Sequence, residues 1–166
     1  MNKIVDNFFI SSWDDGHTCD MYLANLLLEY DIPAIFFIPT HHAKKRLNEE
    51  NILRLSQMGF EIGGHTTNHP SDMKLLSYEK QLTEILDNKR YLENIINKQI
   101  ECFSYPRGRY NEETIKAVKE AGYKYARTTL VLNIEKPTDH YKINSSVHVY
   151  LERKEFNNRT WVEVAR

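Results

Sequence analysis

The sequence predicts an α/β fold, in which parallel strands alternate with helices, and three observations support this. Apolar runs of strand length alternate with segments whose apolar residues recur at helical spacing. The run at residues 34–38 is continuously apolar and ends at Pro39, which is typical of a parallel strand buried on both faces. Polar clusters at residues 14–15, 65–69 and 106–108 directly follow predicted strands. Four strand–helix pairs and a fifth strand leave two architectures open, an open parallel sheet and a barrel.

The first two strand–helix pairs occupy the N-terminal third of the chain. A strand is expected at residues 8–13, followed by a helix that is capped by Thr18 or Asp20 and ends before Pro33. The strand at 34–38 precedes a second helix. That helix starts at Asn48 with two acidic residues in its first turn, and Gly59 provides its C-terminal stop.

The middle of the chain repeats this alternation. A short strand at residues 60–62 precedes the longest helix, which is expected to begin near Ser77 and to bury an apolar stripe between residues 82 and 96. Its outer, charged face is interpreted as solvated. A strand at 100–104 is followed by a helix from Asn111 to Gly122, and a fifth strand covers residues 123–126.

The C-terminal region continues this pattern only in part. Residues 133–144 are polar and predict a loop, and a last strand is expected near residues 147–150. A helical stripe begins in residues 158–166 and stops with the chain. We therefore interpret residues 1–166 as one domain and as a shortened relative of a longer protein.

Composition excludes several classes of function. The 166 residues are 41% hydrophobic, and the formal charge is −1 with 22 basic and 23 acidic residues. This balance gives no basic surface for nucleic acid or anionic membrane and favours a small neutral substrate. The sequence contains no recognisable secretory signal and no apolar run long enough to span a bilayer, so a cytoplasmic protein is expected. Cys19 and Cys102 lack metal-type spacing and are interpreted as free, partly buried thiols.

Two polar clusters carry the chemistry. Asp14 and Asp15 are adjacent carboxylates after a strand, and a fold that holds both usually offsets their repulsion with a cation or a shifted pKa. His65 and His69 are four residues apart, so both imidazoles can face one point. Because the carboxyl ends of parallel strands meet at one edge, a carboxylate could join them in a three-ligand cation site. The simpler alternatives are polar turn residues for the histidines and a turn cap for Asp14.

These clusters resemble the motifs of the polysaccharide deacetylase family, also called NodB-homology or carbohydrate esterase family 4 domains. Residues 12–16 (Ser-Trp-Asp-Asp-Gly) resemble the family's Thr-Phe-Asp-Asp-Gly motif. Residues 65–69 (His-Thr-Thr-Asn-His) resemble its His-Ser/Thr-x-x-His motif. The resemblance covers roughly residues 8 to 130 and implies a distorted (β/α) barrel, which the short C-terminal region suggests is incomplete.

The resemblance also implies roles for individual residues. Asp14 would be the catalytic base, and Asp15, His65 and His69 would bind one divalent metal ion. Zinc is favoured, while cobalt, nickel, manganese and iron accept the same ligands. A metal held by three side chains leaves positions for water and for the substrate carbonyl oxygen and lowers the pKa of the water. The backbone N–H of Arg107 would help to hold the developing oxyanion.

The later family motifs match less well. Ser104 stands where the family has an arginine that orients the base, and Arg127 or Arg107 could supply the missing charge. No Asp-x-x-Asp-Trp segment occurs. His148 only weakly resembles the family's general acid and is more simply interpreted as a strand histidine.

The sequence thus predicts a metal-dependent deacetylase that hydrolyses an acetylated sugar, oligosaccharide or similar amide. Two alternatives stay open: a non-catalytic metal-binding or carbohydrate-binding relative, and a hydrolase of other non-peptide C–N bonds such as cyclic imides. An iron oxygenase is disfavoured because such sites usually lie on all-β folds. Neither nucleic acid nor membrane is an expected partner, and the exposed apolar edge of an unfinished barrel favours a homo-oligomer.

Overall fold

The computed structural model describes residues 9–41, 46–131 and 136–146, and within them strands and helices alternate. The strands are β1 (Ser11–Asp14), β2 (Ala34–Ile38), β3 (Glu61–Gly64), β4 (Cys102–Ser104) and β5 (Tyr125–Arg127). The α-helices are α1 (Asp20–Glu29), α2 (Glu49–Gln57), α3 (Tyr78–Ile96) and α4 (Glu112–Glu120). Two short 3-10 turns, η1 (Met73–Leu75) and η2 (Pro106–Gly108), follow β3 and β4. No helix in the described ranges is both long and apolar enough to cross a membrane.

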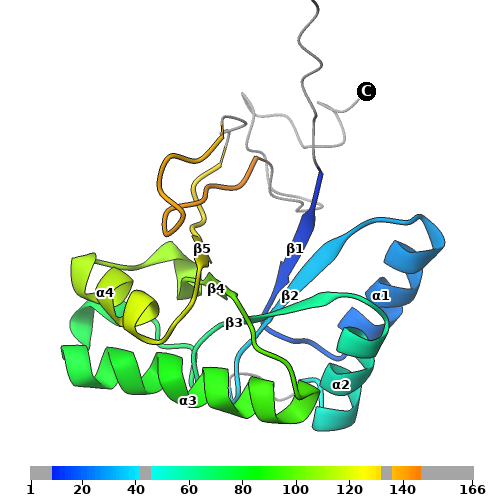
Figure 1. The fold of residues 1–166 in the computed structure, drawn as a ribbon, viewed down its shortest axis with the longest axis horizontal. Helices are drawn as coiled ribbons and strands as arrows, with labels where there is room; N and C mark the ends of the chain where they lie inside the picture. The colour runs from blue at the N-terminus through cyan, green and yellow to red at the C-terminus, as the bar shows by residue number, and fades with distance from the viewer. Residues whose placement is uncertain (1–8, 42–45, 132–135, 147–166) are drawn as a thin grey trace, which may run out of the picture.

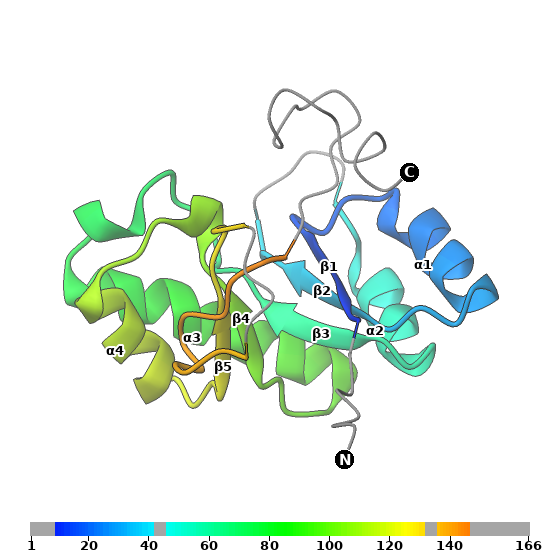
Figure 2. The ribbon, with the colours of Figure 1, turned by 90° about the horizontal axis from the view of Figure 1, so that it is seen from above.

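The strands form one parallel sheet in the order β1-β2-β3-β4-β5, so every strand lies beside its neighbour in the sequence. The helices flank this curved sheet, with α1 and α2 beside β1 and β2, and α3 and α4 toward β4 and β5 (Figures 1 and 2). Sequential parallel strands with outer helices are the geometry of a (β/α) barrel. The predicted α/β class is confirmed, and the five strands correspond to an incomplete barrel.

The core explains why these segments form these elements. In β2, Phe36, Phe37 and Ile38 are buried, and the strand pairs with β1 on one side and β3 on the other. A strand paired on both sides and covered on both faces needs the continuous apolar run that its sequence has. The side chain of Asn48 accepts the backbone N–H of Asn51 at 2.8 Å, which confirms the predicted start of α2.

Several element boundaries differ from those predicted. The first strand begins at Ser11, because its pairing partner β2 begins only at Ala34, and Phe9 is left exposed. Cys19 occupies the N-cap position of α1 and is exposed, so its predicted partial burial is wrong. The strand predicted near residues 147–150 and the helix predicted in 158–166 lie outside the described residues.

Candidate metal and catalytic site

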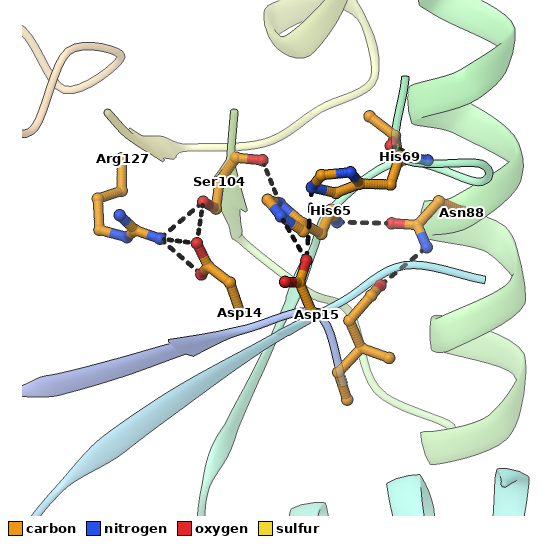
Figure 3. A network of polar contacts seen from close by, with 9 residues as sticks. Asp14, Asp15, His65, His69, Asn88, Ser104 and Arg127 are labelled. Atoms are coloured by element: carbon orange, nitrogen blue, oxygen red, sulfur yellow. Dashed lines mark hydrogen bonds and ion pairs between the residues drawn. The ribbon is translucent and has the colours of Figure 1, made fainter. Parts of the chain in front are cut away.

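The predicted site residues come together where the strands end. Asp14 is the last residue of β1 and Asp15 follows it, while His65 and His69 follow β3 (Figure 3). Asp14 faces the β4–β5 side, and Asp15 faces the two histidines (Figure 3). The backbone of Asp15 is left-handed (φ 75°), so the strand ends at Asp14, and the two adjacent carboxylates have different partners.

Asp15, His65 and His69 have the spacing of a cation site. One potential ligand atom from each lies within 4.8 Å of the others. Asp15 Oδ1 lies 3.4 Å from His69 Nε2 and 3.7 Å from His65 Nε2. Ligands about 2.0–2.1 Å from a tetrahedral zinc ion lie roughly 3.3 Å apart, so these separations fit a shared divalent cation. The side chains of both histidines are buried and that of Asp15 is 51% exposed, which leaves a route for a ligand from solvent.

The protonation of His65 suits a metal ligand. Its Nδ1 lies 2.7 Å from the backbone oxygen of Ser104, and a carbonyl only accepts, so Nδ1 carries the proton. Burial lowers the pKa of His65, against the opposing attraction of Asp14 and the other nearby acceptors. A neutral imidazole with its proton on Nδ1 presents the lone pair of Nε2 toward Asp15 and His69.

Asp14 is held by an arginine and a serine. Arg127 Nη2 donates to Asp14 Oδ1 and Oδ2 at 2.5 and 2.6 Å, and to Ser104 Oγ at 2.8 Å. Burial raises the pKa of Asp14, but His65 and Arg127 attract its negative charge, and hydrogen bonds from Arg127 and Ser104 favour the ionised form. The pKa of Asp14 consequently lies below its ordinary value. Asp14 is therefore an ionised acceptor at neutral pH.

A third carboxylate, Asp20, lies beneath this edge at the start of α1. Its side chain is buried, and burial raises its pKa to about 7 against a hydrogen bond from the His17 backbone. The negative charges of Asp15 and Asp14 raise the pKa further. Asp20 is therefore only partly ionised at neutral pH, and a cation bound nearby would favour its ionised form.

Of the two arginines that the sequence offered as a partner for Asp14, Arg127 makes the contact. The side chain of Arg107 is exposed, and its backbone is left-handed (φ 55°) in the η2 turn directly after β4. The role of the Arg107 N–H as an oxyanion donor stays a prediction. His148, the weak candidate for a general acid, lies outside the described residues.

Sequence reasoning missed two polar residues of α3 that contact the histidine segment. Asn88 is fully buried and accepts the His65 backbone N–H at 2.9 Å, and Glu84 contacts Asn68. The signal was present, since Asn88 is spaced at helical intervals between the buried Ile85 and Leu92. A polar residue within an apolar stripe usually has a buried partner.

Comparisons with known proteins place these motifs in a family. The family model described as polysaccharide deacetylase matches residues 6–126. The Bacillus subtilis (strain 168) protein YxkH, named as a polysaccharide deacetylase, is 35% identical over 130 residues, which are 76% of this chain and 46% of YxkH. The chain thus spans less than half the length of this curated relative.

Solved structures show the same fold. The Streptococcus pyogenes deacetylase PplD, solved with acetate, superposes with a TM-score of 0.75 at 27% identity over 81% of this chain and 61% of PplD. A Bacillus anthracis protein described as a CE4 family pseudoenzyme gives a TM-score of 0.65 at 19% identity, over 76% of this chain and 45% of that protein.

Proposed function

Since the chain belongs to the polysaccharide deacetylase family, we propose that it is a metal-dependent hydrolase that removes the acetyl group from an acetylated sugar or oligosaccharide. The family predicted from the Asp-Asp-Gly and His-x-x-x-His motifs is confirmed. The observation that carries the proposal is that two adjacent residues, Asp14 and Asp15, are placed for two different roles, a base and a metal ligand. Asp15 faces two histidines at metal-ligand spacing, while Asp14 is held ionised beside them.

We assign the cation to Asp15, His65 and His69, with zinc as the proposed metal. Two imidazole nitrogens and one carboxylate oxygen are a usual donor set for catalytic zinc, with positions left for water and substrate. When bound, such a cation polarises the acetyl carbonyl and lowers the pKa of a water molecule. The Ser104 carbonyl fixes the His65 tautomer that this ligand set needs.

Asp14 is the proposed general base. It accepts the proton of the attacking water, and that proton is then available to the departing nitrogen or oxygen of the sugar. Arg127 and Ser104 hold the carboxylate in one orientation and keep it ionised. The Arg107 N–H, in the turn after β4, is proposed to donate to the oxyanion that forms on the acetyl group.

Acetate release from N-acetylglucosamine oligomers and acetylated xylose oligomers tests this proposal. Chelator-treated protein is expected to be inactive and to recover with Zn²⁺ or Co²⁺. Asp14→Asn should lower kcat at least a hundredfold while cation binding measured by calorimetry is unchanged, because the amide cannot accept the proton. Asp15→Asn should instead weaken cation binding. Full activity in Asp14→Asn would refute the assigned base.

A second candidate function is cation or carbohydrate binding without catalysis. It is favoured by the solved neighbour described as a pseudoenzyme, which shares this fold. It predicts stoichiometric metal binding by the wild-type chain without acetate release from either class of oligomer. Acetate release that depends on both metal and Asp14 excludes it.

A further inference from the structure

We propose that Glu84 and Asn88, on successive turns of α3, are positioning residues that hold His65 and His69 in cation-binding geometry. This inference rests on the proposed function, because it concerns the same cation. The two residues are four apart, so they lie on one face of the helix, and that face meets the histidine segment at residues 65–69.

The histidine segment needs external support because its backbone is strained. Thr66 and His69 have left-handed backbones (φ 68° and 49°), although neither residue is glycine. For residues with a Cβ atom this conformation is unfavourable and persists only where the surroundings fix it. Inside the segment, one hydrogen bond from the His69 N–H to Thr66 Oγ1 (3.1 Å) supports the turn. The backbone oxygens of Thr66 and Thr67 also accept the N–H groups of residues 40 and 41, and His65 Nδ1 bonds the Ser104 carbonyl. The remaining hydrogen bonds described for the segment come from α3.

Glu84 holds the middle of the segment through four hydrogen bonds. Its carboxylate accepts the Asn68 backbone N–H at 2.8 Å and the Asn68 side-chain amide at 2.7 Å, one on each oxygen. Its backbone oxygen accepts the Thr67 N–H at 3.0 Å and the Thr67 hydroxyl at 3.2 Å. Hydrogen bonds to a carboxylate are stronger than those between neutral groups. Glu84 thus fixes the two residues that directly precede His69.

Asn88 fixes the other ligand. Its Oδ1 accepts the His65 backbone N–H at 2.9 Å, and its Nδ2 donates to the Ile38 carbonyl and to Thr40 Oγ1, each at 3.0 Å. The side chain is fully buried, so each of these bonds would be costly to lose. Asn88 therefore ties His65 to the end of β2, the strand that lies between the Asp15 strand and the histidine strand.

Neither residue contributes an atom to the cation trio, so both act through the histidines. Glu84 touches the residues before one imidazole, and Asn88 touches the backbone that carries the other. Partners of this kind, which orient metal ligands, typically change metal affinity 10–100-fold when removed. Losing either residue should therefore weaken cation binding, an effect that a loss of fold stability alone would not produce.

The test is calorimetric titration of the chelator-treated protein with Zn²⁺. A second titration with Co²⁺ is followed by the ligand-field absorption of the bound ion. Glu84→Ala and Asn88→Ala are expected to raise the Kd at least about tenfold. Glu84→Gln keeps one accepting oxygen for Asn68, so its Kd should lie between those of the wild type and Glu84→Ala. The ligand-field absorption of bound Co²⁺ depends on the geometry of its ligands. A changed absorption spectrum in the alanine variants would therefore report a displaced imidazole.

Gln81→Ala is the matched control. Gln81 is also fully buried on α3, but it bonds the Leu76 carbonyl and the Thr114 hydroxyl, away from the histidine segment. It should lower the melting temperature and leave the Kd unchanged. If Asn88→Ala fails to fold, the Kd of Glu84→Ala still tests the proposal, because Glu84 is only half-buried.

Three outcomes separate this inference from the proposed function. A Kd raised in Glu84→Ala but not in Gln81→Ala supports the positioning role. Wild-type-like Kd values in all alanine variants overturn that role and leave the proposed deacetylase intact. A wild-type chain that binds neither cation overturns both.

Discussion

At the scale of single residues, the ionised state of Asp14 depends on an arginine 113 positions away in the sequence. Arg127 contacts both carboxylate oxygens through one nitrogen, and its guanidinium also lies 5.2 Å from the Phe37 ring centre. The side chain of Arg127 is 14% exposed and that of Asp14 is 30% exposed, so solvent screens the pair only in part. Burial alone would raise the pKa of Asp14, and Arg127 is one of the groups that reverse this effect.

Replacing Arg127 with Gln should therefore shift the pH dependence of catalysis. Without the guanidinium, burial is opposed by fewer groups and the pKa of Asp14 rises, so a larger share of the base is protonated at mildly acidic pH. The acidic limb of the kcat/KM profile should move to higher pH, and kcat at neutral pH should fall about ten- to a hundredfold. Arg109→Gln is the control, since Arg109 is exposed and pairs with Asp72. If the acidic limb does not move in Arg127→Gln, then Arg127 does not control the pKa of the base.

The site residues differ in how far the sequence could predict them. Asp15 and His65 belong to short local motifs, whose spacing is visible in the chain and predicts a shared cation. The sequence left both Arg127 and Arg107 open as the partner of Asp14. Which arginine reaches Asp14 depends on the register of β4 with β5. Asn88 carries no motif, and its role follows only from the packing of α3 against β3.

At the scale of elements, the two glycines of β3 leave room for side chains of β2, of α3 and of the segment before β5. A Cβ atom on Gly64 would lie 2.0 Å from the Tyr123 hydroxyl and 3.1 Å from Asn88 Oδ1. A Cβ atom on Gly63 would lie 2.4 Å from the Phe37 ring. The distances of 2.0 and 2.4 Å are shorter than real Cβ contacts, so close packing requires the glycine pair directly before His65.

Gly64→Ala should therefore destabilise the fold and disturb the site together. We expect the free energy of unfolding to fall by about 2–3 kcal/mol, as in overpacked cores, and cation affinity to fall with it. Denaturant unfolding measures the first and calorimetry the second.

Tyr123→Phe provides the rescue. Among the described residues the buried Tyr123 hydroxyl has no hydrogen-bond partner, so its removal alone should cost little. In combination with Gly64→Ala it removes the closest clash and should recover part of the lost stability. Strict additivity of the two changes would contradict this account.

Element boundaries illustrate the same limit of sequence reasoning. Helix starts are local, since Ser77 and Asn111 each accept a backbone N–H three residues ahead, and both starts were predicted. Strand limits depend on a partner. The fourth and fifth strands are Cys102–Ser104 and Tyr125–Arg127, shorter or shifted relative to prediction, because pairing of β4 with β5 begins only at Cys102 and Tyr125.

At the scale of the whole molecule, the candidate cation site joins strands that do not pair directly. Asp15 follows β1 and His65 follows β3, with β2 between them, and His65 also bonds the Ser104 carbonyl of β4. Burial is the main cause of the raised pKa of Asp20, and repulsion from the Asp15 and Asp14 carboxylates adds to it. A bound cation would relieve that repulsion and link the ends of several strands at once.

Cation binding should therefore stabilise the entire fold. A ligand that binds only the folded state at a hundred times its Kd adds about 2.7 kcal/mol to the free energy of unfolding. For a chain of this size the melting temperature should rise by roughly 5–10 °C when Zn²⁺ is added to chelator-treated protein, and chelator should reverse the rise. Asp14→Asn, which keeps the three ligands, should show the full shift, whereas Asp15→Asn should show little. Equal shifts in both variants would place the stabilising cation outside the Asp15, His65 and His69 trio, because only the second variant alters a ligand.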